Sequence, residues 1–136
     1  MSKQNGVQVD EKIHYLTSGG GRTVKLSATE RIMLDQILPT ESDITSLRVI
    51  EEIRDQIAFS SADTDRYKVR REGNQIFWDD TVQDRKAISV SKAAVGIIKA
   101  TLQALNETNR LKRLQISLYE MFVEYSEPTM EEAPNV

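Results

Sequence analysis

The chain has 136 residues, of which 39% are hydrophobic and 29% charged, a composition typical of one soluble globular domain rather than a disordered or membrane protein. Its 18 Lys and Arg residues against 21 Asp and Glu residues give a net charge of −3, which argues against a dedicated nucleic-acid binder. The sequence has no cysteine and one histidine, which excludes thiolate metal sites, disulfides, thiol nucleophiles and multi-histidine metal sites.

The composition divides the chain into three parts. Residues 1–22 predict a flexible N-terminal tail, because Ser18-Gly19-Gly20-Gly21 is a linker sequence. Residues 126–136, which are rich in Glu and Pro, predict an acidic C-terminal tail, and a single α+β domain is expected over residues 23–125. The N-terminus does not resemble a secretory signal, and no apolar run approaches the roughly 20 residues of a bilayer span. We therefore expect a cytoplasmic protein that does not enter a membrane.

The first half of the domain predicts a strand and two helices. Thr23–Leu26 alternates polar and apolar side chains, as a short strand does. Ser27 and Glu30 have the spacing of a capping box, so a short helix is expected from Ala28 to Leu38, where Pro39 ends it. A second helix is predicted over residues 44–59, because its apolar residues recur at helical spacing.

The second half predicts a hairpin and two more helices. Residues 66–71 alternate, residues 72–74 suit a three-residue turn, and residues 75–78 form a second β-like run, which together predict a β-hairpin. Lys86–Val90 is a further candidate strand, and helices are expected over residues 91–106 and 113–125. The predicted fold is α+β: four helices with a small antiparallel sheet of two to four strands.

The last predicted helix is apolar on two sides, which suggests a contact surface. One face is expected to pack on the core and carries Leu114, Leu118, Met121, Phe122 and Tyr125. A second stripe of Ile116, Tyr119 and Val123 is the predicted protein-binding surface, either in a homodimer or with a foreign partner. The alternative is that the preceding helix covers this stripe within one chain, through Ile97, Thr101 and Ala104.

The predicted hairpin carries the densest basic cluster: Arg66, Lys68, Arg70 and Arg71. Tyr67, Phe77 and Trp78 lie among or close to these cations, and rings beside cations are the chemistry of a nucleic-acid or nucleotide contact. The alternative is a solvated strand whose charges prevent edge-to-edge aggregation. We expect Trp78, the only tryptophan, to be buried between the sheet and a helix.

Other candidate chemistry in the sequence is weak. His14 lies in the expected tail, Asp79 and Asp80 lack the spacing of a calcium-binding loop, and the glycine run lacks the Lys and Ser or Thr of a phosphate-binding loop. We therefore predict a protein that is not an enzyme and holds no metal or cofactor.

A set of short motifs across residues 24–125 resembles small bacteriophage and prophage proteins of unknown function. The motifs are Lys25-Leu26-Ser27, Glu30-Arg31, Ile37-Leu38-Pro39, Trp78 and Leu118-Tyr119-Glu120-Met121-Phe122. The resemblance implies a phage context and carries over no active-site residue.

These observations predict a non-enzymatic binding protein, a phage accessory factor that engages a host or phage protein. One alternative is a winged-helix-like DNA-binding regulator that uses the basic hairpin at residues 66–71. Its recognition helix would be acidic, with a net charge of −1 over residues 45–58, which counts against phosphate contact. The other alternative is a structural or assembly component of the virion.

Overall fold

The computed structural model describes residues 21–124, so residues 1–20 and 125–136, which hold nearly all of both expected tails, lie outside the described residues. Strands β1 (Arg22–Leu26) and β4 (Lys86–Val90) form an antiparallel ribbon that pairs Arg22 with Val90 and Leu26 with Lys86. Val24 and Leu26 of β1 and Ile88 and Val90 of β4 are buried, and the residues between them are exposed, so one face of the ribbon is apolar. This ribbon is the base of the hydrophobic core.

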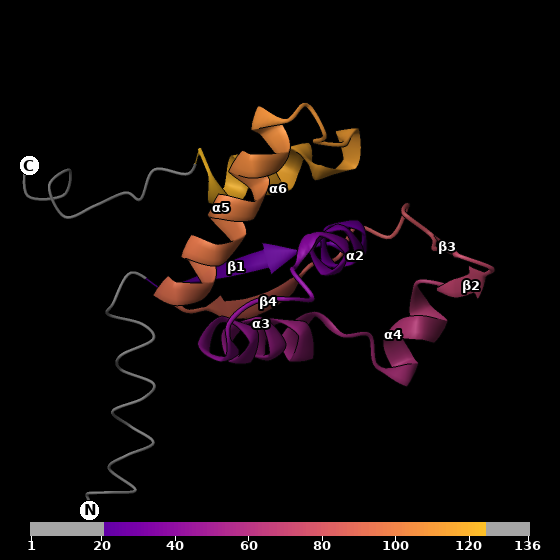
Figure 1. Ribbon diagram of the computed structural model, residues 1–136. Coiled ribbons are helices and arrows are strands. Elements are labelled where there is room, and N and C mark those ends of the chain that lie inside the picture. Colours follow the sequence, from indigo (N-terminus) through magenta and orange to yellow (C-terminus); the bar gives the residue numbers. More distant parts are fainter. Residues whose placement is uncertain (1–20, 125–136) are drawn as a thin grey trace, which may run out of the picture.

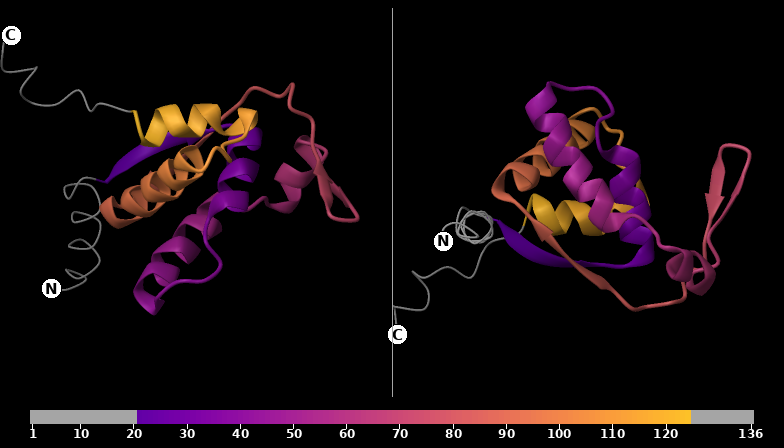
Figure 2. Two further views of the ribbon diagram at one scale, coloured as in Figure 1. Left: turned by 45° about the horizontal axis from the view of Figure 1, so that its top comes forward. Right: turned by 90° about the horizontal axis from the view of Figure 1, so that it is seen from below.

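The α+β prediction is confirmed, and the four expected helices are present. They are α2 (Ala28–Ile37), α3 (Ile44–Ile57), α5 (Lys92–Glu107) and α6 (Ile116–Phe122). The helices gather on the apolar face of the ribbon (Figure 1 and Figure 2), and their buried side chains meet those of the strands in one cluster. Between residues 21 and 124, no helix has the length and apolar character needed to cross a membrane.

Local capping explains where the helices begin. The Ser27 hydroxyl accepts from the Glu30 amide, and the Glu30 carboxylate accepts from the Ser27 amide, which completes the predicted capping box of α2. Asp43 and Ser91 cap α3 and α5 through their side-chain oxygens, which accept from the amides of Ser46 and Ala94. The α2 helix ends before Pro39, as predicted.

Strand β1 begins at Arg22, one residue inside the expected tail. The Arg22 guanidinium donates to the Met121 carbonyl at 3.1 Å and lies over the ring of Phe122, 5.4 Å from its centre. These contacts join the start of the domain to its last helix. Arg22 and Met121 are 99 residues apart in sequence, so no local pattern reveals their contact.

An arm formed by Ser61–Phe77 projects from the rest of the molecule, which we call the body (Figure 1 and Figure 2). It consists of α4 (Ser61–Arg66), β2 (Arg70–Glu72) and β3 (Gln75–Phe77). The expected sheet is therefore two separate two-stranded ribbons, because β2 and β3 pair only with each other. The arm leaves the body after α3 and returns through the segment that leads to β4.

The hairpin is shorter than predicted and is preceded by a helix that we did not expect. Arg66 ends α4 rather than beginning a strand, and Lys68 has a left-handed backbone with φ 53°, which breaks the alternation. The turn contains two residues, Gly73 and Asn74, because Glu72 pairs with Gln75. Gly73 has φ 63°, a conformation that glycine adopts without strain.

The last expected helix is also shorter. Residues 113–115 form a 3-10 turn, η1 (Arg113–Gln115), and α6 begins at Ile116. The side-chain oxygen of the buried Gln115 accepts from the Lys112 amide at 2.9 Å, which fixes the chain as it enters the helix. Tyr125, expected on the core face, lies outside the described residues.

Candidate partner-binding groove

The junction between the arm and the body is built on a buried arginine. Arg31 on α2 is only 2% exposed, and its guanidinium donates to the carbonyls of Ile57 at 3.1 Å and Ala58 at 2.6 Å. The same group donates to the Asp63 carboxylate in α4 at 3.1 Å. One side chain of the body therefore holds both the end of α3 and the start of the arm.

Asp63 both pairs with Arg31 and caps α4 at this junction. Its carboxylate accepts from the Ser60 amide, and its own amide donates to the Ser60 hydroxyl, so the pair forms the capping box of α4. Burial raises the pKa of Asp63, but the Ser60 amide and the hydrogen bond and charge of Arg31 outweigh it and hold the pKa below its ordinary value. The ion pair with Arg31 is therefore charged at neutral pH.

Two aromatic rings extend the junction toward the arm. The Arg31 guanidinium lies over the ring of Phe59, 4.1 Å from its centre, and Phe59 meets Tyr67 edge to face at 5.8 Å. The Tyr67 hydroxyl donates to Asp84 at 3.2 Å, on the segment that returns to β4. Both connections of the arm to the body are thus tied to the same packed cluster, which orients the arm.

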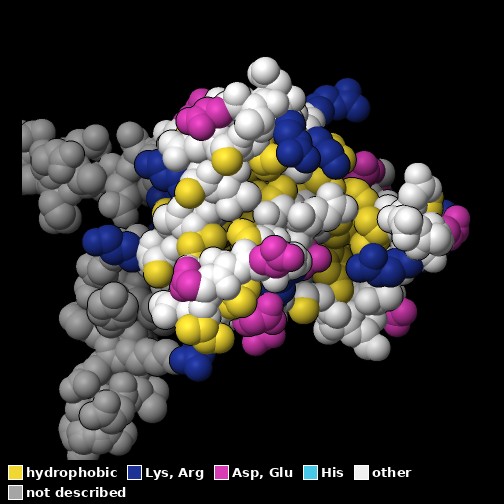
Figure 3. All heavy atoms as spheres, viewed as in Figure 1, with side chains coloured by type: hydrophobic (Ala, Val, Ile, Leu, Met, Phe, Trp, Pro, Cys, Tyr) yellow, Lys and Arg dark blue, Asp and Glu magenta, His cyan; other side chains and the backbone are white. Residues whose placement is uncertain are grey.

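Two adjoining hollows flank this cluster. The first, which we call the arm groove, has a volume of about 550 Å³ and lies between α2, α3 and the arm. A second hollow of about 610 Å³ shares Arg31, Asp55, Ala58 and Phe59 with it. Figure 3 shows hydrophobic side chains at the junction of arm and body, with Lys or Arg side chains beside them. The size suits a side chain or a short segment of another molecule.

One face of the hairpin forms a wall of the arm groove. Arg71 and Ile76 are cross-strand partners, so their side chains share a face, and both line the groove together with Val69. The other face carries Arg70 over the ring of Phe77, 4.8 Å from its centre, and the ion pair of Arg70 with Glu72 at 2.8 Å. The hairpin therefore presents an apolar surface with one cation to the groove.

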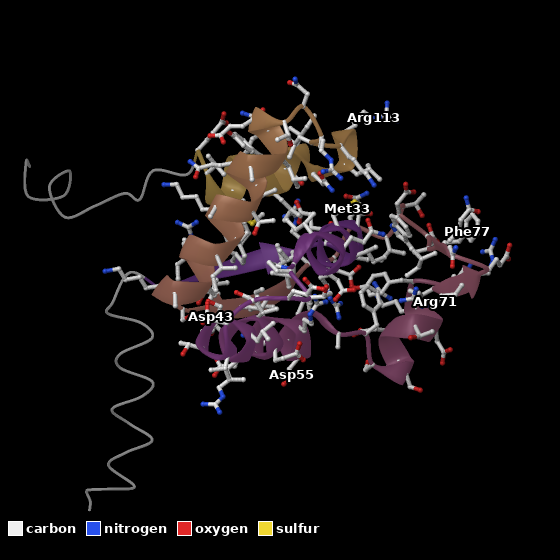
Figure 4. All side chains as sticks on the ribbon, in the orientation of Figure 1. Met33, Asp43, Asp55, Arg71, Phe77 and Arg113 are labelled. Atoms are coloured by element: carbon white, nitrogen blue, oxygen red, sulfur yellow. The ribbon has the colours of Figure 1, made fainter. Side chains whose placement is uncertain are left out.

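Most charges in the arm groove are already paired. Arg54 pairs with Asp35 at 2.6 Å and donates to the Leu38 carbonyl at 3.0 Å. Arg71 lies on the arm and Asp55 on α3 (Figure 4). Within residues 21–124, neither side chain forms a hydrogen bond or an ion pair. These two opposite charges are therefore the ones that the groove offers to another molecule.

The structure disperses the basic cluster predicted for nucleic acid. Arg66 makes a two-pronged contact with Asp84 at 2.9 and 3.1 Å, and this pairing lowers the pKa of Asp84. Arg70 pairs with Glu72, and Lys68 lies exposed in the turn before β2, not on a strand beside Arg70. Arg71 points into the arm groove. The four side chains therefore do not share one surface.

The predicted stripe on α6 is only partly available. Ile116 is 48% exposed, whereas Tyr119 and Val123 are half-buried and pack against the core. The Tyr119 hydroxyl accepts from the Asn106 side-chain amide at 3.4 Å, at the end of α5. Leu114, expected in the core, is also 48% exposed, because residue 114 lies in the 3-10 turn rather than in a continuous helix.

Trp78 is half-buried, whereas we expected it to be buried between the sheet and a helix. Its indole N–H donates to the Thr29 hydroxyl in α2 at 2.7 Å, and the ring packs against the core cluster. Trp78 therefore anchors the returning segment of the arm to the body. In this position the ring packs against apolar side chains while its N–H reaches a polar partner.

Sequence reasoning missed the arm groove, although one signal was present. Ser60 and Asp63 have the same spacing as Ser27 and Glu30, which is the signature of a helix start. Arg31 and Phe59 had no local signal, because their partners come from other elements. Asp55 had none because the opposite wall of the groove belongs to the arm.

Comparisons with models of protein families, with curated proteins and with solved structures found no match for this chain. Among residues 21–124, no group of three carboxylate or histidine side chains is arranged to hold a metal ion.

Proposed function

We propose that this protein is a non-enzymatic binding protein that holds a segment of a partner protein in the arm groove. The observation that carries the proposal is the groove itself, a hollow of about 550 Å³ with an apolar hairpin wall and two charges that have no partner among residues 21–124. Recognition sites combine these features, since apolar surface supplies affinity and a few placed polar groups supply orientation. The setting we propose is the cytoplasm of a phage-infected cell, where the protein acts as an accessory factor.

Contacts at both ends of the arm support the proposal. Arg31 ties the end of α3 to α4, and Trp78 ties the returning segment to α2, so the walls of the groove are positioned without a partner. A preformed surface loses less conformational entropy on binding than a mobile one. The arm therefore presents its hairpin face at a set angle to the body.

Site-specific photocrosslinking tests this proposal. A benzophenone amino acid replaces Val69 in the groove, Gln75 on the other face of the same hairpin, or Ile116 on α6, and each variant is irradiated in its natural cell. We expect one protein to be crosslinked through position 69 and not through position 75. The purified partner should then bind wild-type protein in calorimetry, and Val69→Asp should weaken that binding without lowering the melting temperature.

Four outcomes contradict the proposal. Crosslinking through position 116 alone would move the partner to the α6 surface, and crosslinking to DNA through position 75 would favour the DNA-binding alternative. Recovery of the protein as a stoichiometric part of purified phage particles would favour the virion alternative. Equal crosslinking through all three positions would show non-specific contact.

A further inference from the structure

Two charges of the arm groove have no ion-pair partner in the described part of the chain, and they point to the kind of segment that the groove holds. Arg71 is on the hairpin wall, Asp55 is on the α3 wall, and the half-buried side chains of Phe59, Val69 and Ile76 line the same hollow. Figure 4 shows Arg71 on the arm and Asp55 on α3, so the two charges belong to different walls. The groove is therefore apolar in part and oppositely charged on its two sides.

Pairing elsewhere explains why only these two charges matter for an occupant. Arg31 is neutralised by Asp63, and Arg54 is neutralised by Asp35 with a further contact to Glu51 at 3.5 Å. An occupant that competed for these side chains would have to break existing ion pairs. Arg71 and Asp55 gain a partner without losing one, so complementary charges on an occupant are favoured there.

We propose that the arm groove binds a peptide segment of a partner protein in which an apolar side chain is flanked by one acidic and one basic residue. The apolar side chain packs on Val69 and Ile76, the acidic side chain accepts hydrogen bonds from Arg71, and the basic side chain pairs with Asp55. This inference rests on the proposed function and adds the chemistry of the partner to it. The planar guanidinium of Arg71 suits a carboxylate, which it can bind through two parallel hydrogen bonds.

Short synthetic peptides with one central Leu test the inference by fluorescence anisotropy at low salt. Four peptides carry Glu and Lys, two Glu, two Lys, or two Ser beside the Leu, and are otherwise identical. We expect wild-type protein to bind the Glu and Lys peptide about tenfold more tightly than the Ser peptide, as one charge-assisted hydrogen bond provides. The preference should fall at high salt, because exposed charges are screened.

Charge reversal of each wall gives the decisive comparison. Arg71→Glu leaves two anions in the groove, so the peptide with two Lys should become the tightest ligand. Asp55→Lys leaves two cations, so the peptide with two Glu should become the tightest. Arg70→Glu is the matched control, because it makes the same charge change on the other face of the same hairpin and should leave the wild-type order unchanged.

The inference and the proposed function fail in different ways. If no peptide binds, or if Arg71→Glu and Asp55→Lys leave the order of affinities unchanged, the charge pattern is wrong. The same conclusion follows if Arg70→Glu changes the order as much as Arg71→Glu does, since the effect would then come from net charge. Crosslinking of a partner through position 69 would still support the proposed function in each case, and its absence would overturn that function independently. Melting temperatures confirm that each variant is folded.

Discussion

Arg31 and Asp63 are 32 positions apart in sequence, yet the guanidinium of one donates to the carboxylate of the other at 3.1 Å. This pair joins the buried centre of the body to the first turn of the arm. Arg31 also donates to two backbone carbonyls, and Asp63 balances its charge. Buried arginines are stable in this form, because an isolated buried charge is costly.

Asp63→Asn should lower the free energy of unfolding by about 1–3 kcal/mol, because it weakens a hydrogen bond to a charged, buried group. The amides of the arm should also exchange their hydrogens faster, since the arm loses its tie to α2. Asp65→Asn makes the same charge change on an exposed side chain of the same helix and should alter stability by less than about 0.5 kcal/mol. Equal effects of the two substitutions in chemical denaturation would show that the pair does not hold the arm.

The free energy of unfolding should depend on pH through the ionisation of Asp63 in the same ion pair. The pKa of Asp63 is lower in the folded protein than its ordinary value of 3.8, so the stability that the ionised carboxylate contributes is fully present above the ordinary value. It is lost as the pH falls through the lower pKa of the folded state. The difference in unfolding free energy between wild type and Asp63→Asn should therefore be constant near neutral pH and shrink in acid. A difference that grows in acid would contradict the lowered pKa.

Trp78 and Thr29 should be energetically coupled. Trp78→Phe and Thr29→Val each remove one side of the 2.7 Å hydrogen bond and keep most of the packing. In a double-mutant cycle we expect a coupling energy of about 0.5–1.5 kcal/mol. Trp78→Ala should cost less than the roughly 3–5 kcal/mol of a fully buried aromatic side chain, because the indole is half-buried.

The fluorescence of Trp78 gives a second check. A half-buried indole should emit at a wavelength between those of a core tryptophan and a water-exposed one. Emission typical of full exposure in the native protein would place the ring away from α2 and contradict the hydrogen bond. Unfolding should shift the emission to longer wavelength.

Self-association through α6 stays a prediction, now centred on Ile116. An exposed isoleucine forgoes part of the roughly 1.5–3 kcal/mol gained by full burial, and a two-fold partner would recover some of it. Light scattering at micromolar concentration should give the mass of a dimer, and Ile116→Lys should restore the monomer. Ile44→Lys is the matched control, because Ile44 is an exposed isoleucine at the start of α3, 63% exposed. A monomeric wild-type protein would show that the remaining patch is too small.

Features that depend on neighbouring residues were predictable. Ser27 and Glu30 are three positions apart and satisfy each other's amides, so the start of α2 follows from local chemistry alone. The positions of Ile50, Ile53 and Ile57 predicted the buried face of α3, because helical spacing places them on one side. The alternation in Lys86–Val90 identified β4 for the same kind of reason.

The arm and its groove depend on contacts between distant residues. Nothing near Arg31 in sequence indicates that an arginine on α2 is buried, because its acceptors come from positions 57, 58 and 63. The alternation of residues 66–71 predicted one strand, but the α4 capping box and the left-handed Lys68 interrupt it.

Local sequence by itself determined the class of fold, the starts of the helices and their apolar faces, since these depend on spacing and capping within a few residues. Only the tertiary structure decided which charges are paired and which remain open. Arg66, Arg70 and Arg71 look alike in sequence. Arg66 pairs with Asp84 and Arg70 pairs with Glu72, whereas Arg71 faces the groove without an acidic partner among residues 21–124. The energy of a charge depends on its distance from every other charge, and folding sets those distances.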